Sequence, residues 1–377
     1  MKYAEEFRDG VLARVLADKI AQAVHPLRQY RLMEFCGGHT HAISRYGITD
    51  LLPANVSMIH GPGCPVCVLP VGRIDSAIEL ALGQPLTLCT YADTLRVPAS
   101  KQSSLMQAKA RGADIRMVYS VADALKLAQD NPARATVFFA IGFETTAPST
   151  ALAIRSAERL RLDNFSVFCN HVLTPPAMAA IFEGAPAGGA TSARIDGIVG
   201  PGHVSCIIGS QAYESVATQY RRPLVIAGFE PLDLMQAVLM LIRQLNAGRH
   251  QIENEYSRAV TREGNATAKA LMDEVFELRP SFEWRGLGEI ACSAQRLKPK
   301  YAGFDAERRY GIGYRHAPDN KACECAAILR GAKQPSQCRA FGTACTPESP
   351  MGACMVSSEG ACAAHYSYGR LREPAEV

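Results

Sequence analysis

The fold of this chain is best predicted from one stretch, Ile59-His60-Gly61-Pro62-Gly63-Cys64-Pro65-Val66-Cys67. It overlaps an apolar run over residues 56–60, which is typical of a buried β-strand. Gly61-Pro62-Gly63 predicts a tight turn, and we expect Cys64 to Cys67 to begin a helix. The stretch therefore predicts a strand, a turn and a helix in succession, with two cysteines at the helix start.

Short apolar runs alternate with helical patterns up to Pro231. Helical patterns cover residues 73–82 and 103–111, between successive apolar runs. Such alternation is typical of βαβ units and predicts an α/β protein with mainly parallel sheets. The strands expected, besides residues 56–60, cover residues 31–35, 86–90, 115–119, 136–141, 166–169, 195–199 and 224–227.

Some segments of this region resemble each other. Three pairs match in the same order along the chain, which predicts two similar open parallel-sheet lobes, over residues 27–141 and 142–231. Chance resemblance between Gly-Pro-Gly turns is the alternative. The pairs are Phe35-Cys36-Gly37-Gly38-His39 with Phe168-Cys169-Asn170-His171, the opening stretch with Ile198-Val199-Gly200-Pro201-Gly202-His203-Val204-Ser205-Cys206, and Tyr91-Ala92-Asp93 with Gly228-Phe229-Glu230.

The last third of the chain has a different pattern. Residues 232–246 and 253–276 are predicted to be helical, and the remainder is rich in Gly, Pro and Cys. A region that buries little apolar surface usually needs a stabilising cross-link, which a metal cluster could supply. We expect residues 232–377 to form a helical and loop-rich iron–sulfur domain, packed with an amphipathic N-terminal helix within residues 1–26.

Composition and charge exclude several classes of protein. A formal charge of +4 over 377 residues, without a long basic run, predicts no nucleic acid partner. No apolar stretch is long enough to span a membrane, and the N-terminus does not resemble a signal peptide, so we expect a cytoplasmic protein. In that compartment the thirteen cysteines favour metal or redox chemistry over a disulfide framework. Cys89, Cys169 and Cys292 could instead be small buried hydrophobic residues.

Reactive side chains follow the predicted strands, at the point where each strand ends. In open α/β sheets, ligands bind outside the carboxyl ends of the strands. We therefore expect a cleft between the lobes, lined by Cys36, His39, Cys64, Cys67, Asp93, Glu144, His171, His203 and Glu230.

Cys64 and Cys67 have the spacing of a redox pair. The start of a helix stabilises a thiolate, and Cys-x-x-Cys closes a disulfide with little backbone motion. Half of a structural zinc site is the alternative, although no second Cys-x-x-Cys lies nearby. We favour redox chemistry or transient metal exchange.

Cys36 lies in a different setting, followed by Gly37 and Gly38. Two glycines would let a ligand or another protein approach the thiol closely. His39 could accept the thiol proton or bind the same metal. A nucleophilic cysteine and a buried structural cysteine are the alternatives.

Cysteines in the C-terminal region have the spacing x12, x6 and x16, which matches neither a ferredoxin nor a zinc ribbon. Four thiolates on irregular loops suit a cubane iron–sulfur cluster, and zinc is the rival. Cys323 and Cys354 leave the ligand set open by one or two residues. The four expected ligands are Cys325, Cys338, Cys345 and Cys362.

Six segments together resemble the HypD family, whose members mature nickel–iron hydrogenases. The resemblance runs over essentially the whole chain, with no departure at the key cysteines. The segments are Phe35-Cys-Gly-Gly-His-Thr-His41, Gly61-Pro-Gly-Cys-Pro-Val-Cys67, Thr90-Tyr-Ala-Asp-Thr-Leu-Arg-Val-Pro98, Gly142-Phe-Glu-Thr-Thr-Ala-Pro148, Gly200-Pro-Gly-His-Val-Ser205 and Ser357-Ser-Glu-Gly-Ala-Cys-Ala363.

This resemblance implies a scaffold on which the Fe(CN)2CO group of the hydrogenase large subunit is built. It implies two partners, a HypC-type small chaperone whose N-terminal cysteine shares the iron and a HypE-type cyanide donor. Such a protein is an assembly scaffold with redox activity rather than a conventional turnover enzyme.

The resemblance also implies roles for individual residues. It places the essential iron-binding cysteine at Cys36 and the thiol pair at Cys64 and Cys67. His203, opposite Cys64 in the internal match, is our own candidate for an additional ligand or proton donor. The 4Fe–4S cluster of the family maps by spacing onto Cys325, Cys338, Cys345 and Cys362.

Two other classes of protein explain part of the pattern. A standalone thiol–disulfide reductase would use the cysteine-rich tail and the Cys-x-x-Cys pair but would leave Cys36 without a role. A zinc-stapled binding module would explain the tail alone. Metal analysis separates the zinc-stapled binding module from the two classes that carry an iron–sulfur cluster. Whether Cys36 is needed separates the hydrogenase maturation scaffold from the thiol–disulfide reductase.

Overall fold

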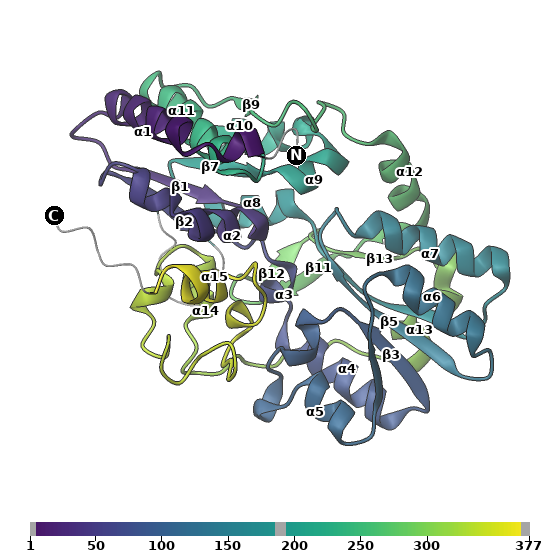
Figure 1. Ribbon diagram of the computed structural model, residues 1–377. Helices are drawn as coiled ribbons and strands as arrows, with labels where there is room; N and C mark the ends of the chain where they lie inside the picture. The colour runs from purple at the N-terminus through teal and green to yellow at the C-terminus, as the bar shows by residue number, and fades with distance from the viewer. Residues whose placement is uncertain (1–4, 185–193, 371–377) are drawn as a thin grey trace.

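Two parallel β-sheets form the centre of the chain in the computed structural model, which describes residues 5–184 and 194–370 (Figure 1). All neighbouring strands within each of these sheets are parallel, which confirms the α/β class. The five-stranded sheet has the order β2-β1-β7-β8-β9 and the four-stranded sheet the order β4-β3-β5-β6. Their bounds are β1 Tyr30–Glu34, β2 Val56–His60, β3 Leu86–Thr90, β4 Asp114–Met117, β5 Ala135–Gly142, β6 Phe165–His171, β7 Gly197–Pro201, β8 Leu224–Ala227 and β9 Ile252–Asn254.

The two parallel sheets are not formed by two successive parts of the chain. Strand β1 lies between β2 and β7, with Met33 opposite both Ile59 and Ile198. The sheets therefore do not follow the expected boundary between residues 141 and 142, because strands from both sides of it share one sheet. The two Gly-Pro-Gly turns end β2 and β7, which flank β1 in that sheet.

Helices cover both sheets. Their bounds are α1 Gly10–Ala23, α2 Gly37–Tyr46, α3 Pro65–Val68, α4 Val71–Gly83, α5 Leu105–Ala110, α6 Val121–Asp130, α7 Ala147–Leu160, α8 Thr174–Glu183, α9 Gly202–Ile208, α10 Glu214–Tyr220, α11 Pro231–Asn246, α12 Ala266–Val275, α13 Ala306–Tyr310, α14 Cys325–Leu329 and α15 Ala361–Tyr368. None of the described helices combines the length and apolar character that a membrane crossing requires.

The expected N-terminal helix is confirmed as α1, preceded by a short 3-10 turn over Glu5–Arg8. Asp9 caps it, because its carboxylate accepts a hydrogen bond of 2.7 Å from the amide of Val11. Helix α1 packs on α11 at the outer side of the five-stranded sheet (Figure 1). Residues 1–4 of the expected N-terminal segment and 371–377 of the expected C-terminal domain lie outside the described residues.

The helix expected over residues 253–276 is wrong in its first half. Strand β9 ends at Asn254, and a loop follows until Asn265, whose side chain accepts a hydrogen bond of 3.0 Å from the amide of Ala268. Gly264, with a φ of +72°, turns the chain before this cap, so only the last part of the stretch is helical. The edge strand β9 has no apolar run and was not expected.

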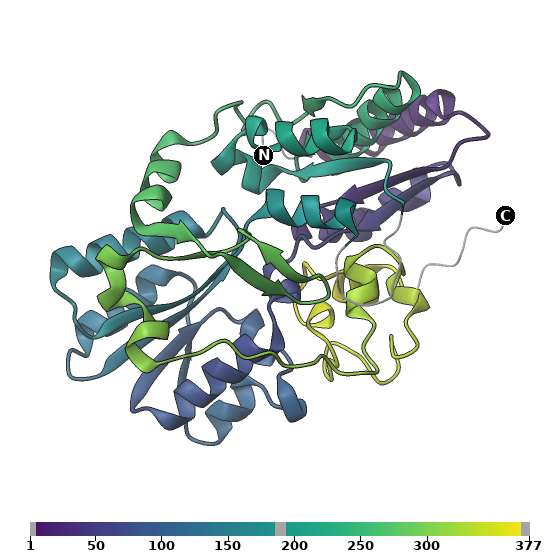
Figure 2. The ribbon, with the colours of Figure 1, turned by 180° about the vertical axis from the view of Figure 1, so that it is seen from behind.

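The C-terminal region contains small antiparallel sheets followed by a cysteine-rich segment, residues 323–370. Strand β10 (Phe276–Leu278) pairs with β13 (Gln295–Leu297), and β11 (Ser281–Trp284) pairs with β12 (Gly288–Ala291). Figure 2 shows this hairpin region between the two parallel sheets and the cysteine-rich segment. The latter packs on α2 through α15.

Candidate functional site

A cavity of about 280 Å³ lies where strands of both parallel sheets end. Both sheets present their carboxyl ends to it, as the cleft expected from the sequence requires. Several expected residues are brought together there, and one segment from far along the chain joins them. The lining includes Cys36 after β1, Gly63 after β2, Asp93 after β3, Thr145 after β5, His203 after β7, and Glu359 from the cysteine-rich segment.

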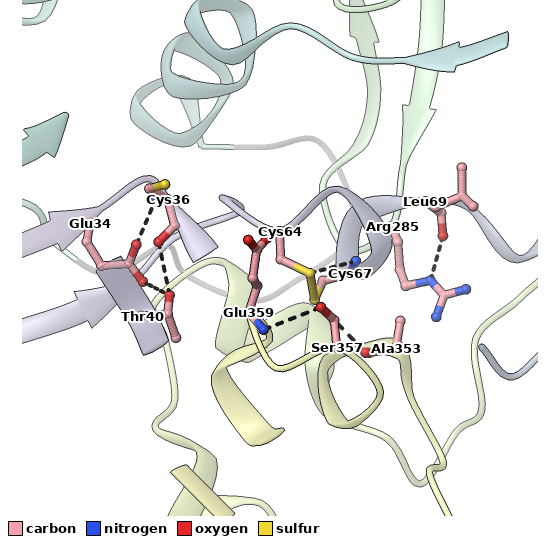
Figure 3. Close-up of a disulfide and its surroundings, with 10 residues drawn as sticks. All are labelled: Glu34, Cys36, Thr40, Cys64, Cys67, Leu69, Arg285, Ala353, Ser357 and Glu359. Carbon is pink, nitrogen blue, oxygen red and sulfur yellow. Dashed lines mark hydrogen bonds between the residues drawn. A yellow bond between two sulfur atoms is a disulfide. The ribbon is translucent and has the colours of Figure 1, made fainter. Parts of the chain in front are cut away.

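Cys36 lies at the junction of β1 and α2 with only 7% of its surface exposed. Its amide donates a hydrogen bond of 2.9 Å to Glu34 (Figure 3). The next amide, of Gly37, donates one of 3.1 Å to the carbonyl of Gly63. Burial raises the pKa of the thiol to about 12, and the carboxylates of Glu359 and Glu34 add to this rise. The thiol is therefore protonated until a cation arrives to favour the thiolate.

Glycines around Cys36 let segments of the same chain approach one another. A Cβ atom on Gly63 would lie 2.4 Å from the backbone nitrogen of Cys36. A Cβ atom on Gly37 would lie 2.4 Å from the Cβ atom of Glu359. The space that the small residues leave near the thiol is thus occupied in part by the loop after β2 and by the cysteine-rich segment.

Cys64 and Cys67 form a disulfide, with their Cα atoms 5.2 Å apart (Figure 3). As expected, the pair stands at the start of a helix, α3. The sulfur of Cys64 accepts a hydrogen bond of 3.2 Å from the amide of Cys67. Both residues are almost fully buried, so thiol–disulfide exchange with a second protein requires a conformational change that exposes the disulfide.

Two carboxylates at this site were not singled out from the sequence. Glu34 is fully buried and accepts hydrogen bonds from the amide of Cys36 and the hydroxyl of Thr40, and its Oε1 lies 3.0 Å from His60 Nδ1. Glu359 lines the cavity, and burial, followed by the charges of Asp93 and Glu34, raises its pKa. A glutamate that directly follows the apolar pair Leu32-Met33 at the end of a strand is the signal that could have identified Glu34.

The two expected histidines have different positions. His203 lines the cavity and stacks on Phe229 with ring centroids 3.8 Å apart, and burial lowers its pKa. His39 is fully buried but is not among the residues that line the cavity. Its Nε2 donates to the carbonyl of Ala227 at 3.2 Å, because a carbonyl oxygen can only accept. Burial lowers the pKa of His39 to about 4, so it is neutral.

The remaining expected residues make structural contacts away from the cavity lining. Glu144 accepts hydrogen bonds of 2.9 Å from the amide and hydroxyl of Thr174, and burial raises its pKa to about 7. Glu230 caps α11 and pairs with Arg8. His171 Nε2 lies 2.9 Å from the hydroxyl of Thr150.

Cysteines of the C-terminal segment converge on a second, small cavity. All four expected ligands line it, together with Cys323. The pKa of Cys323 is lowered to about 7, chiefly by a hydrogen bond with Cys325. Cys354 is fully buried beside Cys325, with which its thiol forms a hydrogen bond. The expected ligands are Cys325, Cys338, Cys345 and Cys362.

The donor set of this cavity consists of thiols, which both iron–sulfur clusters and zinc accept as ligands. Cys325 lies within hydrogen-bonding reach of Cys323, Cys354 and Cys362, so these sulfur atoms converge on one another. By its chemistry the set fits an iron–sulfur cluster, with zinc as the rival.

The disulfide lies close in space to the cysteine cluster, by which we mean Cys323, Cys325, Cys338, Cys345, Cys354 and Cys362. The sulfur of Cys67 lies 4.0 Å from the carbonyl oxygen of Ala353 (Figure 3). Cys354 is the next residue along the chain. The fold and site thus define an α/β protein with a buried thiol at the ends of two parallel sheets, a disulfide in the neighbouring loop and converging cysteines in its C-terminal segment.

Comparison with known proteins identifies the family. The family model described as "HypD: Hydrogenase formation hypA family" matches residues 11–369. The chain is 63% identical over 373 residues to "Hydrogenase maturation factor HypD" of Cupriavidus necator, covering 99% of this chain and 98% of the relative. Identity is 64% over 373 residues to the protein of that name from Azotobacter vinelandii, with the same coverage. For the Escherichia coli (strain K12) protein it is 46% over 373 residues, 98% of each chain. The chain therefore belongs to the HypD family of hydrogenase maturation factors.

Proposed function

We propose that this chain is the scaffold on which iron receives its cyanide and carbonyl ligands before delivery to the large subunit of a nickel–iron hydrogenase. It works with a HypC-type chaperone and a HypE-type cyanide donor. The observation that carries the proposal is the position of Cys36, in a cavity bordered by the Cys64–Cys67 loop, with the cysteine cluster next to that loop.

Iron is the cargo of this site, and Cys36 is its ligand. A soft thiolate together with diatomic ligands favours low-spin iron over hard cations. Glu359 and Asp93 line the same cavity, and their carboxylates offset the positive charge that arrives. His203 is the candidate for a further ligand or a proton donor, because it lines the same cavity. Burial lowers its pKa, which favours the neutral imidazole that a metal ligand requires.

The C-terminal cysteines Cys325, Cys338, Cys345 and Cys362 would hold a 4Fe–4S cluster, which supplies single electrons when bound. Cys64 and Cys67, as a dithiol, release two electrons and two protons when their disulfide forms. An external reductant restores the dithiol by delivering two electrons, one at a time, by way of the cysteine-rich segment, while two protons are taken up from water. The contact between Cys67 and Ala353 gives the path for these electrons.

Infrared spectroscopy tests the proposal. The protein is purified without oxygen from cells that also express its partners, as wild type and as Cys36→Ala. We expect cyanide and carbonyl stretching bands in the wild type and none in Cys36→Ala. Cys292→Ala is the matched control, because Cys292 is exposed and lies away from both cavities, and it should keep the bands.

Two results would contradict the scaffold. Bands of full strength in Cys36→Ala would remove Cys36 from the site. An iron–sulfur protein that never shows the bands, although the partners are present, would favour the standalone thiol–disulfide reductase. That second function is supported by the contact between Cys67 and Ala353, the residue before Cys354, because it also requires the disulfide to lie near the C-terminal cysteines.

A further inference from the structure

A second large cavity, of about 890 Å³, lies apart from the one beside Cys36. Its lining comes from within residues 96–107, from residues 318–320 and from within residues 344–351, and Arg285 at the turn of the β11–β12 hairpin joins them. Cavities of this size typically hold small-molecule ligands. Among the described residues, none of those given a role above lines it, so it is a separate site.

Arg285 brings a buried positive charge to this cavity. Its side chain is only 2% exposed, and Asp319, 37% exposed, lies 3.4 Å from Nε. Nε donates a hydrogen bond of 2.9 Å to the carbonyl of Leu69, and Figure 3 shows the two terminal nitrogens on the side away from that carbonyl. Within the described chain, Nη2 has no hydrogen-bond partner. Because a buried guanidinium N–H without an acceptor costs free energy, such groups nearly always have one.

The charges of the lining suit an anion. Arg96 and Lys101 line the cavity together with Arg285, and the carboxylates of the lining are Asp319 and Glu348. The lining therefore carries one more positive than negative charge. A guanidinium binds a carboxylate or a phosphate through parallel N–H···O hydrogen bonds, so an oxyanion would supply the acceptor that Arg285 lacks.

The segment that carries Lys101 has an uncommon backbone conformation. Lys101 and Gln102 have φ values of 56° and 57°, in the left-handed region that residues with a side chain rarely adopt. Ser100, just before them, is fixed by Asp75, which accepts hydrogen bonds of 3.0 Å from its amide and 2.6 Å from its hydroxyl. Such conformations are often found at ligand sites. Here the surrounding structure holds both side chains at the cavity.

We propose that this cavity binds a small molecule through an oxyanion group, which accepts hydrogen bonds from the terminal nitrogens of Arg285 and is attracted by the charges of Arg96 and Lys101. The excess of a single positive charge favours a carboxylate over a dianionic phosphate. The site goes beyond the proposed function. Because Arg285 also anchors the loop after Cys67 through Leu69, the ligand contacts a residue that borders the thiol pair.

An anion titration followed by tryptophan fluorescence tests the proposal on the full-length, anaerobically purified protein. The single tryptophan, Trp284, directly precedes Arg285. Acetate and inorganic phosphate are the probes, with the ionic strength held constant by sodium chloride. We expect a saturable change, tighter binding of acetate, and a dissociation constant about tenfold higher in Arg285→Gln. Arg330→Gln is the matched control, because Arg330 is buried and donates to Gly286 at 2.8 Å but does not line the cavity.

Arg285→Gln also removes the hydrogen bond to Leu69, so a second variant is needed that leaves the buried contacts in place. Lys101 is exposed, and Lys101→Glu should raise the dissociation constant about fivefold. Lys126→Glu is its control, since Lys126 is an exposed residue of α6 outside the lining, and it should bind as the wild type does.

Three results would overturn the inference. They are the lack of a saturable change in the wild type, equal dissociation constants in Arg285→Gln and Arg330→Gln, and, where Arg285→Gln does not fold, equal constants in Lys101→Glu and Lys126→Glu. Tighter binding of phosphate with the same dependence on Arg285 would support the site and assign it to phosphate esters. None of these results bears on the scaffold, which the infrared bands test.

Discussion

Replacing Gly63 with alanine should displace the loop that borders Cys36. The new Cβ atom would lie 2.4 Å from the backbone nitrogen of Cys36 and 2.6 Å from its Cα atom. These neighbours are backbone atoms, which cannot turn away as a flexible side chain can. The overpacking costs about 1–3 kcal/mol. Loss of the 3.1 Å hydrogen bond between Gly37 and Gly63 adds about 1 kcal/mol. The free energy of unfolding should therefore fall by about 2–4 kcal/mol.

Urea unfolding followed by tryptophan fluorescence measures this change, because the single tryptophan, Trp284, is 1% exposed. With an m-value of about 3 kcal/mol/M, the midpoint should fall by about 1 M. Gly83→Ala is the matched control, since Gly83 has no atom within 4 Å of a Cβ and ends helix α4. It should gain up to about 1 kcal/mol. A Gly63→Ala protein as stable as Gly83→Ala would refute the close approach of the two loops.

Three further predictions follow from the site. Cys64→Ser should keep the iron of the cysteine cluster but stop ligand assembly, as iron analysis and infrared bands would show; normal cyanide loading would contradict the electron relay. Cys338→Ser should lower the iron content, whereas Cys89→Ala, in strand β3, should not, and equal iron in both would exclude Cys338 as a ligand. The pKa of Glu144 is raised from 4.5 to about 7, so the unfolded chain ionises first and wild-type stability falls as pH rises from about 4.5 to 7. Urea titrations of the wild type and of Glu144→Gln measure this change. Between pH 4 and pH 8 the free energy of unfolding of the wild type should fall, relative to that of the variant, by an amount on the order of 3 kcal/mol. The same dependence of stability on pH in both proteins would argue against a buried proton on Glu144.

Strand positions were predictable because these strands are mostly buried and rich in apolar residues, even where a polar residue such as Ser57 interrupts them. The predicted and observed bounds of β2, β3 and β8 coincide. Which strands pair was not predictable, because one buried apolar run resembles another whatever its neighbour. Only the structure shows that β1 pairs with β7, more than 160 residues later.

The site was predictable where it depends on strand ends and not where it depends on distant segments. Cys36, Asp93 and His203 each follow a strand, and they line one cavity. Glu359 belongs to a segment without periodicity, so nothing in its local sequence indicates that it packs against Gly37. His39 lies in the first turn of α2, and the direction of its side chain depends on the register of that helix.

The packing of Glu359 against Gly37 has a consequence for protein synthesis. The ribosome adds about 5–20 residues per second, so the 322 residues from Gly37 to Glu359 take roughly 15–65 s. During that interval the nascent chain presents Cys36 without the wall that later borders it. The cavity beside Cys36 is therefore complete only when the chain up to Glu359 has been translated and has packed against Gly37.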